Sequence, residues 1–100
     1  MKAWILPLAF FVFTPALAQD GHVVVQKGRH FLPAEVTVNR GESLTFTNSD
    51  PFIHQIYVPG LFDSEEKAPG ENLTESFPKS GTFTVRCHIH PKMKLVVHVR

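Results

Sequence analysis

The chain has 100 residues, with ten lysines and arginines, nine aspartates and glutamates, six histidines and one cysteine. This near-neutral balance, without a run of basic residues, argues against a nucleic-acid partner, and one cysteine excludes an internal disulfide framework. A chain of this length can bury one modest core.

The N-terminal segment has the three regions of a secretory signal peptide. Lys2 supplies the basic region, an apolar run follows, and Ala16-Leu17-Ala18 offers small residues for cleavage. The apolar run is shorter than the ~20 residues of a spanning helix, and Pro7 interrupts it. We therefore predict a cleaved signal peptide over residues 1–18, export to the periplasm without a membrane span, and a single mature domain over residues 19–100.

The mature region alternates apolar and polar residues in short runs between turn residues, with no helical period beyond one or two turns. Leu44 and Phe46, for example, are expected to face inward from one such run. The segment 59–72 contains several acidic residues and is predicted to be a surface loop. The pattern predicts an all-β fold, a two-sheet Greek-key β-sandwich. Its seven predicted strands cover residues 22–27, 35–38, 43–48, 54–58, 73–77, 82–87 and 94–99, and its predicted core includes Phe31, Leu44, Phe46, Phe77, Phe83, Val85, Val97 and Val99.

Soft metal donors are concentrated around the single cysteine in the segment RCHIHPKMK, residues 86–94. An exported thiol without a disulfide partner is exposed to oxidation unless it is buried in the core or bound to a metal. Strand alternation turns Cys87 inward at a strand end, and two residues separate Cys87 from His90 and His90 from Met93. This spacing lets one tight loop bring a thiolate, an imidazole and a thioether to one point.

A fourth donor must come from elsewhere, and His54 is the best candidate because it begins a predicted strand just after the break at Asp50-Pro51. One thiolate, two imidazoles and a weak thioether form the donor set of a blue-copper site, whereas structural zinc sites rarely use methionine. Taken singly, Cys87 and Met93 fit core positions and His54 fits an ordinary strand end. Together they predict one type 1 copper ion bound by His54, Cys87, His90 and Met93.

The mature chain resembles the cupredoxins, in particular their amicyanin-like and plastocyanin-like members. The likeness rests on the short ligand loop 87–93, on residues 31–38 and 41–46, and on Asn48-x-Asp50-x-x-x-His54. It implies a Greek-key β-sandwich with one type 1 copper that exchanges one electron between Cu(I) and Cu(II). It further implies three equatorial ligands, His54, Cys87 and His90, and an axial Met93.

Two positions depart from this family pattern. Gln55 stands where many relatives have asparagine, which puts a side-chain link between the two ligand segments in doubt, and Ile89 stands where amicyanin and plastocyanin have proline. Proline lacks an N–H group. We therefore predict that the N–H groups of Gln55 and Ile89 both donate hydrogen bonds to Cys87 Sγ, which would favour Cu(I).

The function expected from these features is that of a monomeric one-electron carrier without enzymatic activity. His90, in the middle of an exposed loop, is the expected docking point for a transient redox partner, and Lys92 and Lys94 are placed to orient an acidic one. The alternative is a periplasmic copper-handling protein for tolerance, storage or delivery, which the additional histidines at positions 22, 30 and 88 favour. Strand alternation turns His88 away from Cys87, towards solvent.

Overall fold

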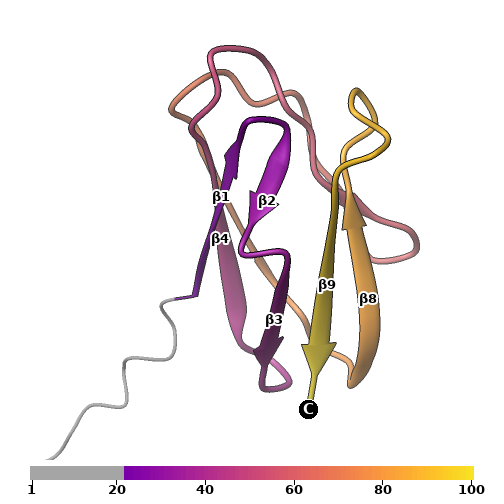
Figure 1. Ribbon diagram of the computed structural model, residues 1–100. Helices are drawn as coiled ribbons and strands as arrows, with labels where there is room; N and C mark the ends of the chain where they lie inside the picture. Colours follow the sequence, from indigo (N-terminus) through magenta and orange to yellow (C-terminus); the bar gives the residue numbers. More distant parts are fainter. Residues whose placement is uncertain (1–21) are drawn as a thin grey trace, which may run out of the picture.

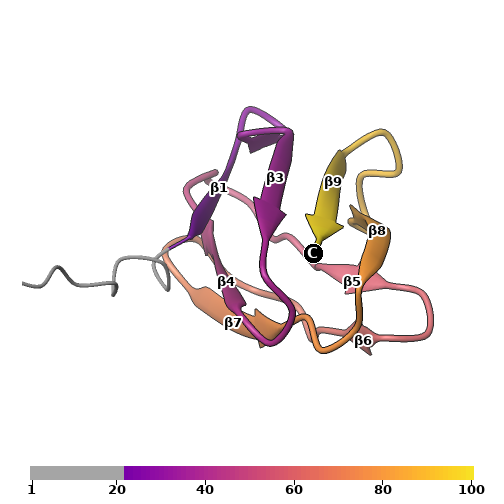
Figure 2. The same cartoon turned by 90° about the horizontal axis from the view of Figure 1, so that it is seen from below.

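The computed structural model describes residues 22–100, and the predicted signal peptide lies outside this range. These residues form two packed β-sheets, and none of them lies in a helix long and apolar enough to cross a membrane (Figures 1 and 2). The strands are β1 (Val23–Lys27), β2 (His30–Leu32), β3 (Glu35–Val38), β4 (Ser43–Asn48), β5 (Tyr57–Val58), β6 (Phe62–Asp63), β7 (Asn72–Ser76), β8 (Gly81–Arg86) and β9 (Lys94–Val99).

The two sheets have the strand orders β2-β1-β4-β7 and β3-β9-β8-β5-β6. Figure 2 shows them as two facing layers. The pairs β1–β4 and β3–β9 are parallel, and the remaining neighbours are antiparallel. The chain passes from one sheet to the other between β2 and β3, β3 and β4, β4 and β5, β6 and β7, and β7 and β8. This arrangement confirms the predicted all-β, two-sheet Greek-key sandwich.

The core lies between the sheets and follows the alternation of the strands. In β4, Leu44 and Phe46 are at most 1% exposed, while the threonines between and after them are half-buried. Burial of each large apolar side chain of this kind contributes about 1.5–3 kcal/mol. The predicted core residues are buried except Phe83, which packs partly buried against the others. The well-packed core therefore holds the ends of the strands, and the loops that join them, in fixed positions.

Several strand predictions were wrong in extent. Strands β2 and β6 were not predicted, and the predicted strand 54–58 is reduced to β5, with His54 in an isolated bridge to Lys67. Strand β6 forms inside the predicted loop because Phe62 and Asp63 pair with β5. Such short pairs are stabilised by their neighbours in the sheet and leave little trace in local sequence.

The turn that joins β1 to β2 consists of Gly28 and Arg29, with φ angles of 62° and 60°. Glycine adopts this left-handed conformation freely, whereas a residue with a side chain is strained there by about 1–2 kcal/mol. The Asp50 carboxylate accepts hydrogen bonds from both N–H groups, at 2.6 Å and 3.1 Å, and so holds the turn in place. In Figure 1 this turn lies at the same end of the sandwich as the loop between β8 and β9.

Candidate metal centre

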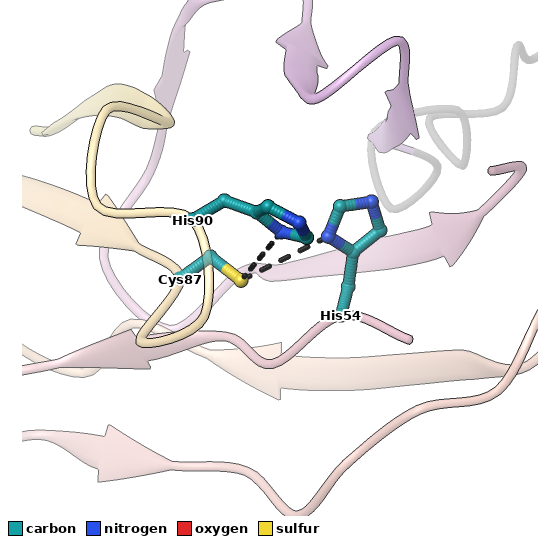
Figure 3. A group of neighbouring side chains, drawn as sticks. All are labelled: His54, Cys87 and His90. Carbon is teal, nitrogen blue, oxygen red and sulfur yellow. Dashed lines mark hydrogen bonds between the residues drawn. The ribbon is translucent and has the colours of Figure 1, made fainter. Parts of the chain in front are cut away.

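Three of the four predicted ligands meet at this end of the sandwich. Donor atoms of His54, Cys87 and His90 lie within 4.8 Å of one another. Nδ1 of His54 and Nδ1 of His90 are each 3.8 Å from Cys87 Sγ (Figure 3). Cys87 directly follows β8 and His90 belongs to the loop before β9, whereas His54 lies on the connection between β4 and β5. Tertiary folding therefore brings a histidine from a distant segment to the cysteine.

The fourth predicted ligand, Met93, lies at the end of the same loop. Its side chain is buried, and its N–H group donates a 2.9 Å hydrogen bond to the carbonyl oxygen of His90. This bond closes residues 90–93 into a turn and brings the loop back to β9. The ligand role of Met93, like that of the other three residues, stays a prediction.

The Cys87 thiol is buried and has one backbone donor. Gln55 N–H donates to Cys87 Sγ at 3.3 Å. The predicted second donor was wrong: within residues 22–100, no hydrogen bond joins Ile89 N–H to this sulfur, and Ile89 itself is 43% exposed. The Gln55 backbone makes the link between the two ligand segments, so the length of its side chain is immaterial to that link.

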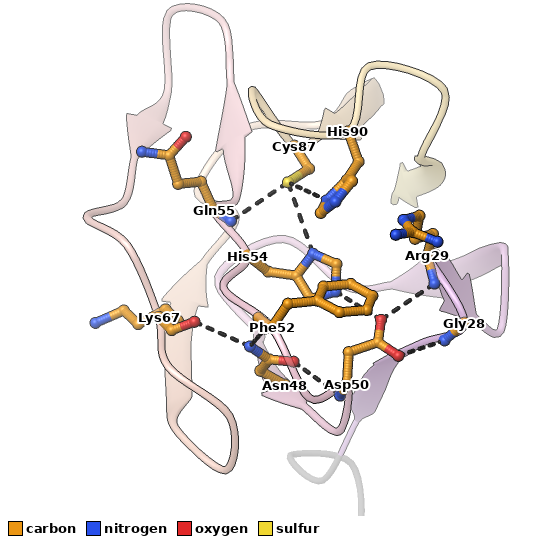
Figure 4. Close-up of polar contacts among 10 residues, drawn as sticks. All are labelled: Gly28, Arg29, Asn48, Asp50, Phe52, His54, Gln55, Lys67, Cys87 and His90. Atoms are coloured by element: carbon orange, nitrogen blue, oxygen red, sulfur yellow. Dashed lines mark hydrogen bonds and ion pairs between the residues drawn. The ribbon is translucent and has the colours of Figure 1, made fainter.

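The Asp50 carboxylate fixes the orientation of His54. Asp50 Oδ2 lies 2.7 Å from His54 Nε2, and both side chains are buried (Figure 4). A carboxylate with three N–H neighbours acts as an acceptor, so the hydrogen of the neutral imidazole sits on Nε2. The lone pair of Nδ1 is then free and faces Cys87 Sγ.

The Asn48 side chain holds the backbone of Asp50 in place through a hydrogen bond. This buried side chain accepts a hydrogen bond from Asp50 N–H at 2.9 Å and donates to the carbonyl oxygens of Phe52 and Lys67, at 2.8 Å and 2.9 Å. The backbones of His54 and Lys67 exchange two further bonds, of 3.1 Å and 2.7 Å. Hydrogen bonds to Asn48 and to Lys67 therefore fix the position of the segment that carries His54.

The Phe52 ring covers both imidazoles of the site. Its centroid lies 5.3 Å from that of His54 and 5.4 Å from that of His90. The guanidinium carbon of Arg29 lies 4.7 Å from the same ring, in the geometry of a cation–π contact (Figure 4). Phe52 thus shields the histidines from solvent and links them to the turn between β1 and β2.

The surroundings shift the pKa values of two groups. Burial acts to raise the pKa of Asp50, but the hydrogen bonds from His54, Arg29 and Gly28 outweigh it and leave the pKa below its usual value. Burial lowers the pKa of His90, and a positive charge on His54, when that ring is protonated, and the Arg29 guanidinium lower it further against the opposing effect of Asp50. A lowered pKa keeps the His90 imidazole neutral at neutral pH, with a lone pair available for a metal.

His88 points away from this centre, as strand alternation predicts. It is exposed, its ring stacks on Tyr57 at a centroid distance of 3.6 Å, and its Nε2 lies 3.2 Å from both carboxylate oxygens of Asp63. His22 lies apart from the centre, with its Nε2 3.8 Å from a Glu42 oxygen. Within residues 22–100, no group of three or more possible ligands other than His54, Cys87 and His90 is present.

Sequence reasoning named Asn48 and Asp50 within the family-like segment Asn48-x-Asp50-x-x-x-His54, but it assigned neither of them a role in the centre. Phe52 and Arg29 were not named. One local clue existed for Asn48, because strand alternation places it on the inward face with Leu44 and Phe46, where an amide must find partners. The contacts of Asp50 with Gly28 and Arg29 join segments about twenty residues apart and have no local signature, whereas its contact with His54 spans four residues.

The cupredoxin-like domain family matches residues 2–97 of the chain. The chain belongs to the cupredoxin family. This cupredoxin is 33% identical to the chloroplastic plastocyanin of Tetradesmus obliquus, over 60% of the chain and 50% of the relative. It is 35% identical to the plastocyanin of Ginkgo biloba, over 60% of the chain and 75% of the relative. The chain therefore spans about half the length of the first relative and about three quarters of the second.

Solved structures agree with this cupredoxin in fold. A purple cupredoxin from Nitrosopumilus maritimus superposes with a TM-score of 0.75 at 20% identity, over 79% of this chain and 99% of that one. An amicyanin variant in its Cu(I) form has a TM-score of 0.75 at 20% identity, over 85% and 87%. A copper-containing nitrite reductase from Thermus scotoductus has a TM-score of 0.73 at 23% identity, over 95% of this chain but 25% of that one.

Proposed function

We propose that this cupredoxin binds one copper ion through His54, Cys87, His90 and Met93 and acts as a one-electron carrier. The observation that carries the proposal is the convergence of a sulfur and two ring nitrogens within 4.8 Å on buried or half-buried residues. The donor set fits copper, because a thiolate, two imidazoles and a thioether suit this metal, and no carboxylate belongs to the group.

A bound copper ion would supply reversible one-electron chemistry between Cu(I) and Cu(II). The residues of the chain keep the donors in place through this change. The Asp50 carboxylate orients His54, Gln55 N–H stabilises the Cys87 thiolate, and the strands on both sides of the ligand loop anchor it to the sandwich. A rigid donor set limits the rearrangement that accompanies each electron transfer, and this suits a carrier.

The His90 ring offers the path by which an electron passes between the metal centre and a partner protein. It is half-buried, and its neighbours Ile89 and Pro91 are exposed. A small apolar patch of this kind suits a brief encounter with a redox protein. We propose that such a partner docks here against a monomer of the cupredoxin.

The arrangement favours a carrier over a copper-handling protein or an enzyme. The copper-handling alternative depends on three additional histidines, His22, His30 and His88. Within residues 22–100 they do not form a second group of three ligands, and His22 and His88 each face a separate carboxylate. The copper-containing nitrite reductase shares only a quarter of its length with this chain, so most of that enzyme has no counterpart in the superposition.

We also propose export to the periplasm through residues 1–18. The support is the order of basic, apolar and small residues at the N-terminus. N-terminal sequencing of the protein recovered from a periplasmic extract tests this proposal. A mature protein that begins near Gln19 is expected, and an uncleaved cytoplasmic product would contradict it.

Copper titration of the purified protein tests the central proposal. Cu(II) should bind with a stoichiometry of one and give an intense visible band from charge transfer between the Cys87 thiolate and the metal. The Cys87→Ser variant should lose this band, and the His88→Ala variant should keep it because His88 points elsewhere. Absence of the band in the wild type, or equal loss in both variants, would contradict the proposed site.

A second measurement separates a carrier from a copper-handling protein. The carrier should show reversible one-electron voltammetry and should retain its copper when a soluble chelator is added. Binding of more than one ion, or rapid loss of the metal to the chelator, would instead support copper handling.

A further inference from the structure

A pocket of about 280 Å³ opens beside His90. One wall is the turn between β1 and β2, and the other is the loop between β8 and β9, so two distant segments form it. Its apolar surface comes from the ligand loop, and Arg29 and Lys92 contribute positive charges. The lining residues are Arg29, Ile89, His90, Pro91, Lys92 and Met93.

Arg29 is held in a strained backbone conformation next to this pocket. Its φ angle is 60°, a value that favours glycine. Its N–H group donates to the buried Asp50 carboxylate at 3.1 Å, and its guanidinium rests on the Phe52 ring. Strained residues of this kind persist where the surrounding structure holds them, and they concentrate at functional sites. The chain thus keeps an arginine at a position where glycine would fit the turn better.

The positive charges at the pocket have no acidic neighbour in its lining. Arg29 and Lys92 are exposed, and within residues 22–100 neither forms an ion pair with a carboxylate. The Ile89 side chain, 43% exposed, lies on the same pocket. The surface therefore presents unpaired cations around an apolar contact, directly beside the half-buried His90.

We propose that Arg29, together with Lys92, selects an acidic docking surface on the redox partner. Carboxylates of the partner bind at Arg29 and Lys92, and an apolar side chain between them enters the pocket against Ile89. The planar guanidinium suits a carboxylate because it donates two parallel hydrogen bonds. This inference rests on the proposed carrier function and deepens it by naming the chemistry of the partner and a recognition residue outside the ligand loop.

The expected partner is a protein surface, because the pocket combines charge with apolar area. A small inorganic anion would satisfy the cations but leave the apolar part uncovered. Attraction between opposite charges also speeds the encounter and weakens as salt screens it. Charge therefore sets which partners approach His90, and the apolar contact sets how closely they dock.

The first test maps an anionic probe on the protein by NMR. Hexacyanochromate(III) is a paramagnetic, redox-inert trianion, and it should broaden the backbone signals of Arg29, Ile89 and Lys92 in both the Cu(I) and the metal-free protein. The Arg29→Glu variant should bind it about fivefold or more weakly. Lys79→Glu is the matched control, since it makes the same charge change at the exposed turn before β8, at the opposite end of that strand from Cys87.

The Arg29→Gly variant separates recognition from folding. Glycine suits the left-handed turn, so its thermal unfolding temperature should stay close to that of the wild type, whereas its affinity for the trianion should fall. Equal weakening in Arg29→Glu and Lys79→Glu would overturn the inference. So would broadening centred on Lys79 or Lys94.

Two short peptides test the apolar part of the pocket. In both the Cu(I) and the metal-free protein, the acetylated, amidated peptide Asp-Asp-Leu-Asp-Asp should shift the signals of Ile89 and Met93 more than the same peptide with glycine in place of leucine. Equal shifts would mean a site for an adventitious ion only. Because both tests also use the metal-free protein, failure of copper binding would remove the carrier function while leaving the mapping of this surface to be judged on its own result.

Discussion

Oδ2 of Asp50 lies 2.7 Å from Nε2 of His54, with 5% and 0% of the two side chains exposed. The same carboxylate accepts hydrogen bonds from the N–H groups of Gly28 and Arg29. One buried side chain therefore holds a histidine of the candidate metal centre and the turn that carries the proposed recognition arginine. The geometry of the centre depends on a residue that binds no metal.

Replacement of Asp50 should destabilise the metal-free protein in proportion to the hydrogen bonds lost. Asp50→Ala leaves three N–H donors without their acceptor and should lower the free energy of unfolding by about 3–5 kcal/mol. Asp50→Asn keeps one acceptor oxygen and should lower it by about 1–3 kcal/mol. Urea denaturation measures both. Asp63→Ala, at an exposed site, is the control and should change the value by less than about 1 kcal/mol. An equal effect of the two alanine variants would contradict the role assigned to Asp50.

Acid should destabilise the metal-free protein in two stages. The pKa of His90 is lowered in the fold, so below its ordinary value of 6.5 the unfolded chain takes up a proton before the folded protein does. The free energy of unfolding therefore falls from that pH until the folded pKa is passed. The pKa of Asp50 is also lowered, so a second loss begins near its ordinary value of 3.8 and continues to its folded pKa.

Urea denaturation between about pH 8 and about pH 3, a range that includes both ordinary pKa values, measures these losses. The His90→Gln variant should lack the first loss, and the Asp50→Asn variant should lack the second. A wild-type profile that matches that of His90→Gln above about pH 5 would show that His90 does not contribute.

The reduction potential of the copper-loaded protein should depend on the backbone of Gln55 and not on its side chain. Gln55→Pro removes the N–H group that donates to Cys87 Sγ, so the thiolate gives more charge to the metal and the potential should fall. Gln55→Ala keeps the N–H group and should leave the potential unchanged. Redox titration compares the three proteins. A higher potential in the proline variant would reject this account.

Gln26 should be a destabilising residue in the core. Its side chain in β1 is fully buried, and within residues 22–100 neither its amide nitrogen nor its amide oxygen has a hydrogen-bond partner. An unpaired buried amide costs about 1–3 kcal/mol. Gln26→Met, similar in volume, should therefore raise the free energy of unfolding by about this amount. Gln26→Glu should lower it, because it buries a charge. A loss of stability in the methionine variant would show that the amide is solvated within the fold.

Local sequence was sufficient for the features that depend on neighbouring residues. The alternation of residues 43–48 predicted the inward direction of Leu44 and Phe46, because successive side chains of a strand point to opposite faces. The two-residue gaps from Cys87 to His90 to Met93 predicted a compact donor loop, since the covalent chain keeps these residues close. Both predictions rest on distances that the backbone itself limits.

Tertiary structure decided the features that join distant segments. Three contacts depend on how the strands are ordered in the two sheets. They are the approach of His54 to Cys87, the hydrogen bonds from Gly28 and Arg29 to Asp50, and the pairing of β6 with β5. Many alternative pairings of these strands would be about equally compatible with the β-propensities of their residues. The burial of apolar side chains in a shared core selects among them. The donors of this protein are therefore a property of its sequence, and their meeting point is a property of its packed sandwich.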